Sequence, residues 1–239
     1  MALPRGASAR AAEVRARLAE LYPDAECALV HENPFQLLVA TIMSAQTTDE
    51  NVNKVTPELF ARYPTPSDLA HARPEDVEEI IHSTGFFRSK AKNIIGMARA
   101  LDDDFDGEVP TQLEDLVTLP GVGRKTGNVV RSVAFDLPGL PVDTHVGRLS
   151  RRLRLTSETD PVRAEMDLNR LVPPDERGRF SLRLILHGRR VCFARNPNCD
   201  GCVLVDICPS AYPDGGRPGA SRPGPRAASS RARARDGQP

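Results

Sequence analysis

The sequence predicts an all-α protein, and three observations support this fold class. Apolar residues recur three or four positions apart along most of the chain, as they do on one face of a helix. No segment shows the alternation of apolar and polar residues that is typical of a run of strands. Short segments that contain proline and glycine separate the helical patterns. We therefore expect about ten short helices joined by turns, without an internal repeat.

Two of these helices are marked by an N-cap residue followed by proline. Asn33-Pro34 stands before the apolar segment 35–43, and Asp160-Pro161 stands before the segment 162–171. The side chains of Asn and Asp accept hydrogen bonds from the first free amides of a helix, and proline fits its first turn. Both segments are therefore expected to begin helices at these positions.

Other helix starts are indicated by hydroxyl and acidic side chains. Ser89 is the expected N-cap of a helix whose apolar stripe consists of Ala91, Ile94, Ile95, Ala98 and Leu101. Thr111 and Glu114 have the spacing of a capping box, which predicts a short helix around residues 113–117. A further stripe consists of Val129, Val130, Val133 and Ala134.

The composition is that of an ordinary globular protein: 239 residues, 40% hydrophobic and 27% charged, with 32 Lys+Arg against 32 Asp+Glu. It excludes a collagen, a coiled coil and a fully disordered chain. The length allows one large or two small domains, and we expect two. No apolar run approaches the roughly 18 to 20 residues that cross a bilayer, and residues 1–21 lack the apolar core of a secretory signal. We therefore expect no membrane association and a reducing intracellular compartment.

The C-terminal segment differs from the rest of the chain. Residues 211–239 contain six Arg against two Asp, a net charge of +4, so the remainder carries −4. Residues 212–239 have almost no large apolar side chains and are expected to form a disordered basic Pro/Gly/Arg tail. Such a tail either holds nucleic acid non-specifically or is simply solvated.

Four of the five cysteines are clustered. They are spaced Cys192-x6-Cys199-x2-Cys202-x5-Cys208, while Cys27 stands alone. Disulfides are rare in a reducing compartment, so four clustered thiolates predict a metal or cluster site. Zn²⁺ and a [4Fe-4S] cluster both satisfy the ligand count. Because all four ligands are thiolates, we expect a structural or docking role rather than catalysis.

The segment L-P-G-V-G-R-K-T at residues 119–126 lies between two predicted helices and has the pattern of a helix-hairpin-helix. Its glycines permit a sharp turn and a close approach to a DNA phosphate, which the free amides of the next helix would bind without reading sequence. A plain interhelical turn is the alternative. The predicted DNA-contacting residues here are Leu119, Gly121, Val122, Gly123 and Arg124.

Lys125 is the next residue of this hairpin, in a chain with only four lysines. A lysine amine can act as a nucleophile toward an electrophilic sugar carbon, whereas a guanidinium cannot. The alternative is a lysine that binds phosphate. On chemistry alone, both remain open.

Asp143 lies in the segment V-D-T-H at residues 142–145 and precedes another predicted helix. As an N-cap, its carboxylate would accept a backbone N–H bond. A carboxylate that faces the hairpin could also act as a base or stabilise positive charge on a ribose ring, and the two roles are compatible. His145 is expected to pack or form a hydrogen bond.

Two polar or aromatic loops complete the candidate residues. Gln46 follows the apolar helix at residues 35–43 and could fill a gap in a base stack, or simply end the helix. Phe86 and Phe87 stand in a loop, where an aromatic ring could enter the DNA or complete the core. We expect at least one of the two in the core.

Taken together, these motifs resemble the endonuclease III family of helix-hairpin-helix, iron-sulfur DNA glycosylases, from about Ser8 to Pro209. Further matching segments are S-A-Q-x-T-D at residues 44–49, G-F-F-x-S-K-A-x-N-I at 85–94 and L-I-L-H-G at 184–188. Two positions depart from the family pattern. Gly127 stands where an alanine is common, and Phe86 stands where an aliphatic wedge is commoner.

The resemblance implies a bilobal fold with DNA in the cleft between the lobes. One lobe would comprise residues 1–26 and 138–211 with one [4Fe-4S] cluster on the four cysteines, and the other a six-helix domain at residues 27–137. We further expect a monomer in the cytoplasm, associated with the nucleoid if bacterial.

The same resemblance implies a bifunctional enzyme of base excision repair. Its partner would be double-stranded DNA containing oxidised pyrimidines or abasic sites. Lys125 would form a Schiff base with the flipped-out nucleotide, assisted by Asp143, and β-elimination would nick the strand 3′ to the abasic site. Gln46 and Phe86 would fill the vacated space.

Two other functions fit part of the sequence. A monofunctional relative such as an adenine glycosylase shares the cysteine spacing but lacks a lysine at position 125. A DNA-binding or redox-sensing module would explain the hairpin and the cysteines, but not Lys125 and Asp143 together.

Overall fold

The structure is a computed structural model that describes residues 2–212. Within this range the chain is all helical, with no strand, which confirms the predicted fold class. The α-helices are α1 (Ala7–Leu21), α2 (Pro34–Met43), α3 (Asp49–Arg62), α4 (Pro66–Ala70), α5 (Pro74–Ile81), α6 (Phe87–Asp104), α7 (Leu113–Leu116), α8 (Arg124–Ala134), α9 (Thr144–Arg152), α10 (Pro161–Asn169) and α11 (Arg177–Arg190). Three short 3₁₀ helices, η1 (His82–Thr84), η2 (Pro174–Glu176) and η3 (Val205–Ile207), lie between or after them.

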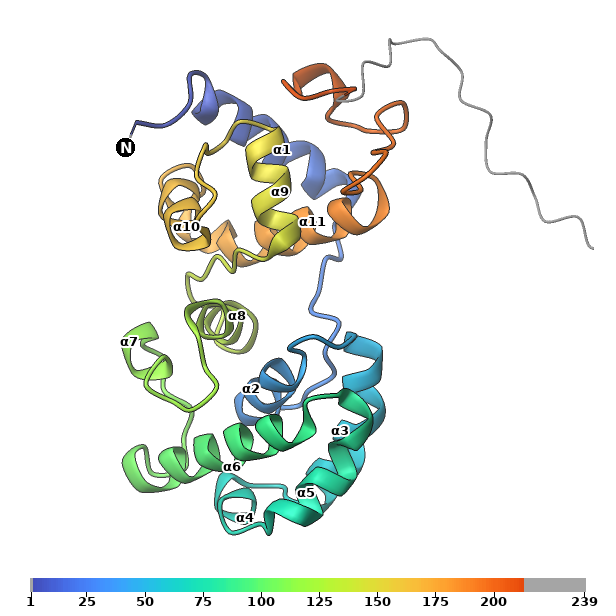
Figure 1. The fold of residues 1–239 in the computed structure, drawn as a ribbon. Coiled ribbons are helices and arrows are strands. Elements are labelled where there is room, and N and C mark those ends of the chain that lie inside the picture. The colour runs from blue at the N-terminus through green and yellow to red at the C-terminus, as the bar shows by residue number, and fades with distance from the viewer. Residues whose placement is uncertain (1, 213–239) are drawn as a thin grey trace, which may run out of the picture.

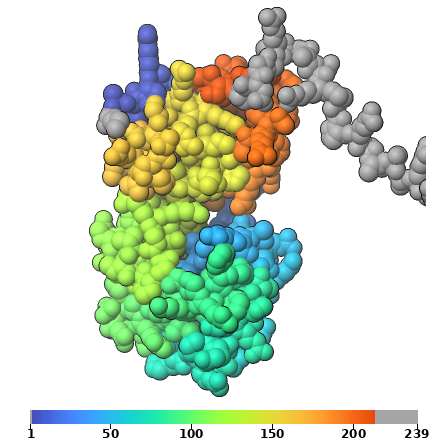
Figure 2. Space-filling model, viewed as in Figure 1, coloured from blue at the N-terminus to red at the C-terminus, as the bar shows by residue number. Residues whose placement is uncertain are grey.

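The buried apolar side chains form two clusters at opposite ends of the molecule. One contains side chains from α2 to α8. The other combines α1 with α9, α10, α11 and the segment that follows them. In Figure 1 the N-terminal α1 accordingly lies beside α11, although most of the chain separates them, and it shares a core cluster with α9. Helix α8 contacts both α2 and α11, and Figure 2 shows the yellow-green α7–α8 segment between the two ends.

The caps predicted before proline are confirmed. The side-chain oxygen of Asn33 accepts a hydrogen bond of 2.9 Å from the Gln36 amide at the start of α2. Asp160 accepts one of 2.9 Å from the Arg163 amide at the start of α10. These starts are local, because the cap and the amide that it satisfies are three residues apart.

The predicted cap of α6 is wrong. The helix begins at Phe87, with Phe86 in the N-cap position, so Ser89 lies inside the first turn. The reason is the left-handed conformation of Phe86, at φ 46°. It allows the Phe86 carbonyl to accept a hydrogen bond of 3.0 Å from the Lys90 amide, so the helix begins earlier in the chain than predicted.

The predicted capping box before α7 is also wrong. This helix begins at Leu113 with Gln112 as its N-cap, and no side chain caps it. A capping box requires the acidic residue at the third helical position. Because the helix starts one residue later than Thr111 would require, Glu114 falls at the second position and the reciprocal pair cannot form.

Glycines allow close packing around the hairpin. A Cβ at Gly127 in α8 would lie 2.7 Å from Leu113 Cδ1 of α7. A Cβ at Gly121 would lie 2.8 Å from Asn93 Cβ of α6, and Gly121 has a φ of +77°. The departure at Gly127 noted in the sequence therefore accompanies a close approach of α7 to α8.

The end of the described chain differs from the expectation at one residue. Tyr212, the first residue of the expected tail, donates its amide to Cys199 Sγ at 3.3 Å and its hydroxyl to Asp200 at 3.0 Å. The rest of the predicted basic tail, residues 213–239, lies outside the described residues. Between residues 2 and 212, no helix is both long and apolar enough to cross a membrane.

Candidate active site and cysteine cavity

The hairpin presents backbone rather than apolar side chains at its surface. Leu119 and Val122 are only 2% and 6% exposed and belong to the first core cluster. Any DNA contact of these two residues must therefore come from their backbone. Gly123 is the N-cap of α8, makes no side-chain capping bond, and has open space where a Cβ would stand. The first amides of α8 thus have no side-chain cap, as in an anion-binding helix start.

Lys125 and Asp143 come together at two adjoining cavities. Both line a cavity of about 520 Å³, whose wall is completed by residues of α9 and α10 and of the segments that precede them. Both also line a second cavity of about 130 Å³, whose other residues come mostly from α2, α8, α11 and the segment 26–29, with Ser44, Asp49 and Pro141. Lys125 is exposed and Asp143 is half-buried. The two predicted catalytic residues therefore share the space between the two core clusters.

Asp143 has the predicted capping role. Its Oδ1 accepts the Val146 amide at 2.8 Å, which makes Asp143 the N-cap of α9. His145, in the first turn of the same helix, forms a hydrogen bond of 3.1 Å between Nδ1 and the Arg148 guanidinium. The predicted packing or hydrogen-bonding role of His145 is thereby confirmed. Asp143 thus has a structural function that is independent of any chemistry.

Arg124 is engaged within the protein. Its Nε and Nη2 each donate to a different carboxylate oxygen of Glu165 in α10, both at 2.8 Å. The Glu165 side chain is only 6% exposed, and its hydrogen bonds raise the pKa of Arg124 above its usual value. This bidentate pair joins the hairpin helix to the second core cluster. A phosphate contact by Arg124 would have to share or break this pair.

Gln46 and Phe86 both stand on exposed loops in left-handed conformations. Gln46 is exposed with a φ of 55°, and Phe86 is 67% exposed with a φ of 46°. Phe87 packs against the first core cluster and stacks on His82, with 4.4 Å between ring centroids. The expectation that at least one of the two phenylalanines lies in the core is therefore confirmed for Phe87.

The four clustered cysteines surround one cavity. Cys192, Cys199, Cys202 and Cys208 all line a space of about 30 Å³ together with apolar residues such as Val191 and Val205. None forms a disulfide. Between residues 2 and 212, no three His, Cys, Asp or Glu side chains are grouped so as to hold a single metal ion. Four soft sulfur donors around a shared cavity fit an iron-sulfur cluster, in which the cysteine ligands are distributed over several iron atoms.

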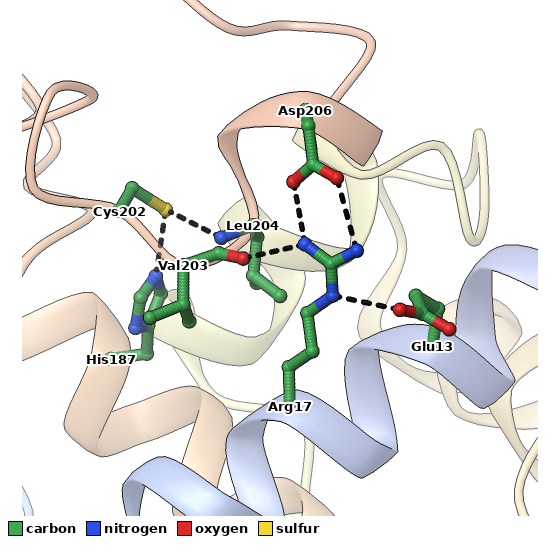
Figure 3. Close-up of polar contacts among 7 residues, drawn as sticks. All are labelled: Glu13, Arg17, His187, Cys202, Val203, Leu204 and Asp206. Atoms are coloured by element: carbon green, nitrogen blue, oxygen red, sulfur yellow. Dashed lines mark hydrogen bonds and ion pairs between the residues drawn. The ribbon is translucent and has the colours of Figure 1, made fainter.

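Hydrogen-bond donors point at the sulfur atoms. Arg152 donates to Cys192 Sγ at 3.2 Å, and the Leu204 amide donates to Cys202 Sγ at 3.4 Å. His187 Nε2 lies 3.3 Å from Cys202 Sγ (Figure 3). Burial raises the pKa of Cys202 to about 11 and lowers that of His187 to about 4. Cys202 must therefore lose its proton before its sulfur can bind iron, and the surrounding N–H groups favour the resulting thiolate.

Cys27 is separate from this cavity. It borders the 130 Å³ cavity and a further cavity of about 300 Å³ that contains neither Lys125 nor Asp143. Burial raises the pKa of the Cys27 thiol, so it remains protonated at neutral pH. A buried thiol of this kind is unreactive, and Cys27 has no indicated role in the site.

Sequence reasoning missed the residues that support these groups. Glu165 pairs with Arg124 across 41 positions, and Arg152 reaches Cys192 across 40. No local pattern connects residues so far apart. For His187 there was a signal, because it belongs to the segment L-I-L-H-G that was recognised as a motif.

Comparison with known protein families agrees with this arrangement. Residues 39–174 match the family described as "HhH-GPD superfamily base excision DNA repair protein". Residues 192–208 match the "Iron-sulfur binding domain of endonuclease III", and this match begins at the first of the four cysteines and ends at the last. The "Endonuclease III" of Synechocystis sp. is 57% identical over 203 residues, which cover 84% of this chain and 93% of the relative.

Solved structures are similar over most of the chain. "Structure of a non-covalent Endonuclease III-DNA Complex" matches with a TM-score of 0.80 and 42% identity, covering 85% of this chain and 95% of that one. "Structure of a Trapped Endonuclease III-DNA Covalent Intermediate: Estranged-Adenine Complex" matches with a TM-score of 0.81 and 43% identity, covering 85% and 96%. The chain therefore belongs to the endonuclease III family of base excision DNA repair proteins, carries that family's iron-sulfur domain, and is a DNA glycosylase and abasic-site lyase.

Proposed function

We propose that this enzyme removes oxidised pyrimidines from double-stranded DNA and nicks the strand 3′ to the resulting abasic site. The observation that carries the proposal is that Lys125 and Asp143 line the same two cavities. An amine and a carboxylate in one cleft supply a nucleophile and a proton acceptor. The uncapped start of α8 beside them supports a position for the DNA backbone.

In the proposed reaction, Asp143 accepts a proton from the Lys125 amine, and the nitrogen lone pair forms a bond to C1′ of the damaged nucleotide. The C1′–N bond to the base breaks, and its electron pair leaves with the base, which takes up a proton. The C1′–O4′ bond then breaks, O4′ takes up a proton, and a protonated imine forms between C1′ and Lys125. A base removes a C2′ proton, and the C3′–O bond breaks with its electron pair leaving on the phosphate. Water then hydrolyses the imine and releases Lys125.

The nucleotide must leave the base stack before Lys125 can reach C1′. We propose that Gln46 and Phe86 occupy the space that it vacates, and the exposure of both side chains supports this role. The α8 amides at Gly123 and Arg124 would bind a neighbouring phosphate without reading sequence. The hairpin contacts expected at Leu119, Gly121 and Val122 would then be backbone contacts, since the side chains of Leu119 and Val122 are buried.

We further propose that the iron-sulfur cluster is one [4Fe-4S] group held by the four cysteines. The two core clusters would correspond to two domains, one of residues 1–26 and 138–211 and one of residues 27–137. We propose a monomer that acts on DNA in the cytoplasm, associated with the nucleoid if the protein is bacterial. The separation of buried residues between the two clusters supports the domain bounds.

The test uses the cluster-loaded protein and a duplex with one thymine glycol. The wild type is expected to nick the strand and, with borohydride, to form a covalent complex that migrates slowly on a denaturing gel. Lys125→Gln should lower both products by about a thousandfold, because glutamine cannot form an imine. The lesion is an oxidised pyrimidine, so the same assay tests the substrate class.

Other outcomes would identify the rival functions. Base release without trapping would indicate a monofunctional glycosylase in which water, not Lys125, attacks the sugar. Tight binding without base release or nicking, by protein with a full cluster, would indicate a binding module. A covalent complex formed by Lys125→Gln would eliminate Lys125 as the nucleophile.

A further inference from the structure

Gln46 and Phe86 are two of several exposed residues with left-handed backbone, and they stand on loops that are far apart in sequence. Gln46 lies in the loop between α2 and α3, and Phe86 lies between η1 and α6. Left-handed backbone is unfavourable for residues with a Cβ, so such loops keep this shape only when neighbouring groups hold it. The contacts that hold these two loops therefore decide how Gln46 and Phe86 are presented.

Asn51 contacts both loops at once. It stands in the first turn of α3, and its Nδ2 donates to Thr47 Oγ1 at 3.1 Å and to the Ser83 carbonyl at 2.9 Å. Thr47 is next to Gln46, and Ser83 lies in η1, three residues before Phe86. A carbonyl accepts only, so the amide nitrogen of Asn51 must face Ser83. The two N–H groups of one amide thus bridge the two loops.

Two other contacts each hold one of the loops. The Thr48 hydroxyl accepts the Asn51 amide at 3.2 Å, which anchors the first loop to the start of α3. Lys90 is only 4% exposed, and its Nζ donates to the Thr84 carbonyl at 2.8 Å, which supports the second loop from within the core. Asn51 differs from Thr48 and Lys90, because its side chain connects one loop to the other.

We propose that Asn51 is a positioning residue that holds Gln46 and Phe86 at a fixed separation for insertion into damaged DNA. This inference rests on the proposed function, in which both side chains enter the gap left by one flipped nucleotide. Two groups that must enter one gap bind better when they are already correctly spaced, because less ordering remains to be done on binding. Asn51 therefore contributes to recognition of the damaged site more than to general DNA affinity.

The test measures the dissociation constants for two duplexes: one with a tetrahydrofuran abasic-site analogue and one intact. Asn51→Ala removes both bridging bonds. Loss of these two bonds should reduce the preference for the abasic duplex by about tenfold. Affinity for intact duplex should change less than about twofold, because asparagine is uncharged and its loss removes no ion pair with the DNA backbone.

A second variant separates positioning from folding. Asn51→Asp places a carboxylate at the third helical position after Thr48, where it completes a capping box and favours the α3 N-terminus. The fold is therefore retained, but a carboxylate cannot donate to Thr47 or Ser83. Its charge weakens binding to both duplexes alike, so the ratio of the two constants still falls about tenfold.

The control is Thr65→Ala, which removes the N-cap bond of α4, away from both loops. It should lower thermal stability and leave the ratio unchanged. As a direct readout, 2-aminopurine opposite the abasic analogue should show weaker fluorescence enhancement with both Asn51 variants, because a loosely held wedge unstacks it less.

Two results would contradict the inference, and they are distinguishable. If the wild type prefers the abasic duplex and both Asn51 variants keep that preference, Asn51 has no positioning role. If the wild type binds both duplexes equally, the proposed function fails and the role of Asn51 falls with it.

Discussion

At the scale of single residues, the proposed catalytic pair comes from two helix starts that face the same cavities. Lys125 lies in the first turn of α8, and Asp143 is the N-cap of α9. Both helices direct their positive ends toward the cleft, which favours the negative charge of a DNA backbone. Asp143 satisfies a backbone amide there, so its loss could lower activity either by damaging the helix or by removing a charge.

Asp143→Asn separates these two effects. Asparagine is as good an N-cap as aspartate, so the bond to the Val146 amide is retained and unfolding free energy should change by less than about 0.5 kcal/mol. Asparagine cannot accept a proton, so the rate of nicking should fall by about a hundredfold. The measurements are urea unfolding and single-turnover nicking of abasic duplex.

Asp143→Ala is the comparison for this prediction. It removes both the cap and the charge, so it should lose the same activity and in addition about 1 kcal/mol of stability. If Asp143→Asn retained full activity while Asp143→Ala lost it, the role of Asp143 would be structural only.

At the scale of elements, the hairpin depends on two glycines for different reasons. Gly121 has a φ of +77°, and a Cβ there would lie 2.8 Å from Asn93 Cβ. Gly123 has an ordinary φ of −91°, and nothing lies within 4 Å of where its Cβ would be. The first glycine is thus required by the fold, and the second leaves an open surface at the start of α8.

Gly121→Ala should therefore affect mainly stability, and Gly123→Ala mainly DNA binding. Gly121→Ala should lower unfolding free energy by about 2 to 3 kcal/mol, from backbone strain and collision with Asn93. Gly123→Ala should leave it nearly unchanged but weaken DNA binding by about tenfold, because the methyl group keeps a phosphate from the α8 amides. Thermal unfolding and fluorescence anisotropy measure the two effects. Equal DNA affinity of Gly123→Ala and wild type would argue against phosphate binding at this turn.

The same scale shows what the sequence could predict. Caps such as Asn33 and Asp143 were predictable, because the cap and its amide lie three residues apart. The start of α6 was not, because it depends on Phe86 adopting a backbone conformation that phenylalanine rarely takes. Lys125, Asp143 and the cysteines were identified from motifs, whereas Glu165 and Asn51 act through partners in distant segments, and spacing alone does not show such partners.

At the scale of the whole molecule, the first helix supports the last described segment. The Arg17 guanidinium in α1 donates to the Val203 carbonyl at 2.8 Å and to both carboxylate oxygens of Asp206, at 2.5 and 3.0 Å (Figure 3). Glu13 accepts a further bond from Arg17 at 2.8 Å. Val203 and Asp206 lie between Cys202 and Cys208, so the N-terminal helix holds the loop that would carry the iron-sulfur cluster.

Arg17→Ala should accordingly speed loss of the cluster. Without the guanidinium, the loop between Cys202 and Cys208 opens more often, and iron release to a chelator should become about two- to threefold faster, a modest effect because the pair is solvent-exposed. Arg17→Lys should be intermediate, because lysine keeps the charge but cannot bind both Asp206 oxygens in a fork. Arg17 lowers the pKa of Asp206, so the contact is present at neutral pH and weakens as pH falls through that lowered pKa.

The matched control is Arg62→Ala, which breaks a surface ion pair with Asp76 at 3.0 Å between α3 and α5, away from the cysteine loop. It removes a comparable ion pair, so any general effect of losing surface charge should appear there as well. Visible absorbance of the cluster, followed after addition of chelator at pH 7, gives the rate for each variant. Equal rates for Arg17→Ala, Arg62→Ala and the wild type would show that α1 only packs against this end of the molecule. A faster rate for Arg17→Ala alone would show that cluster retention depends on a contact between two segments nearly 190 residues apart in the chain.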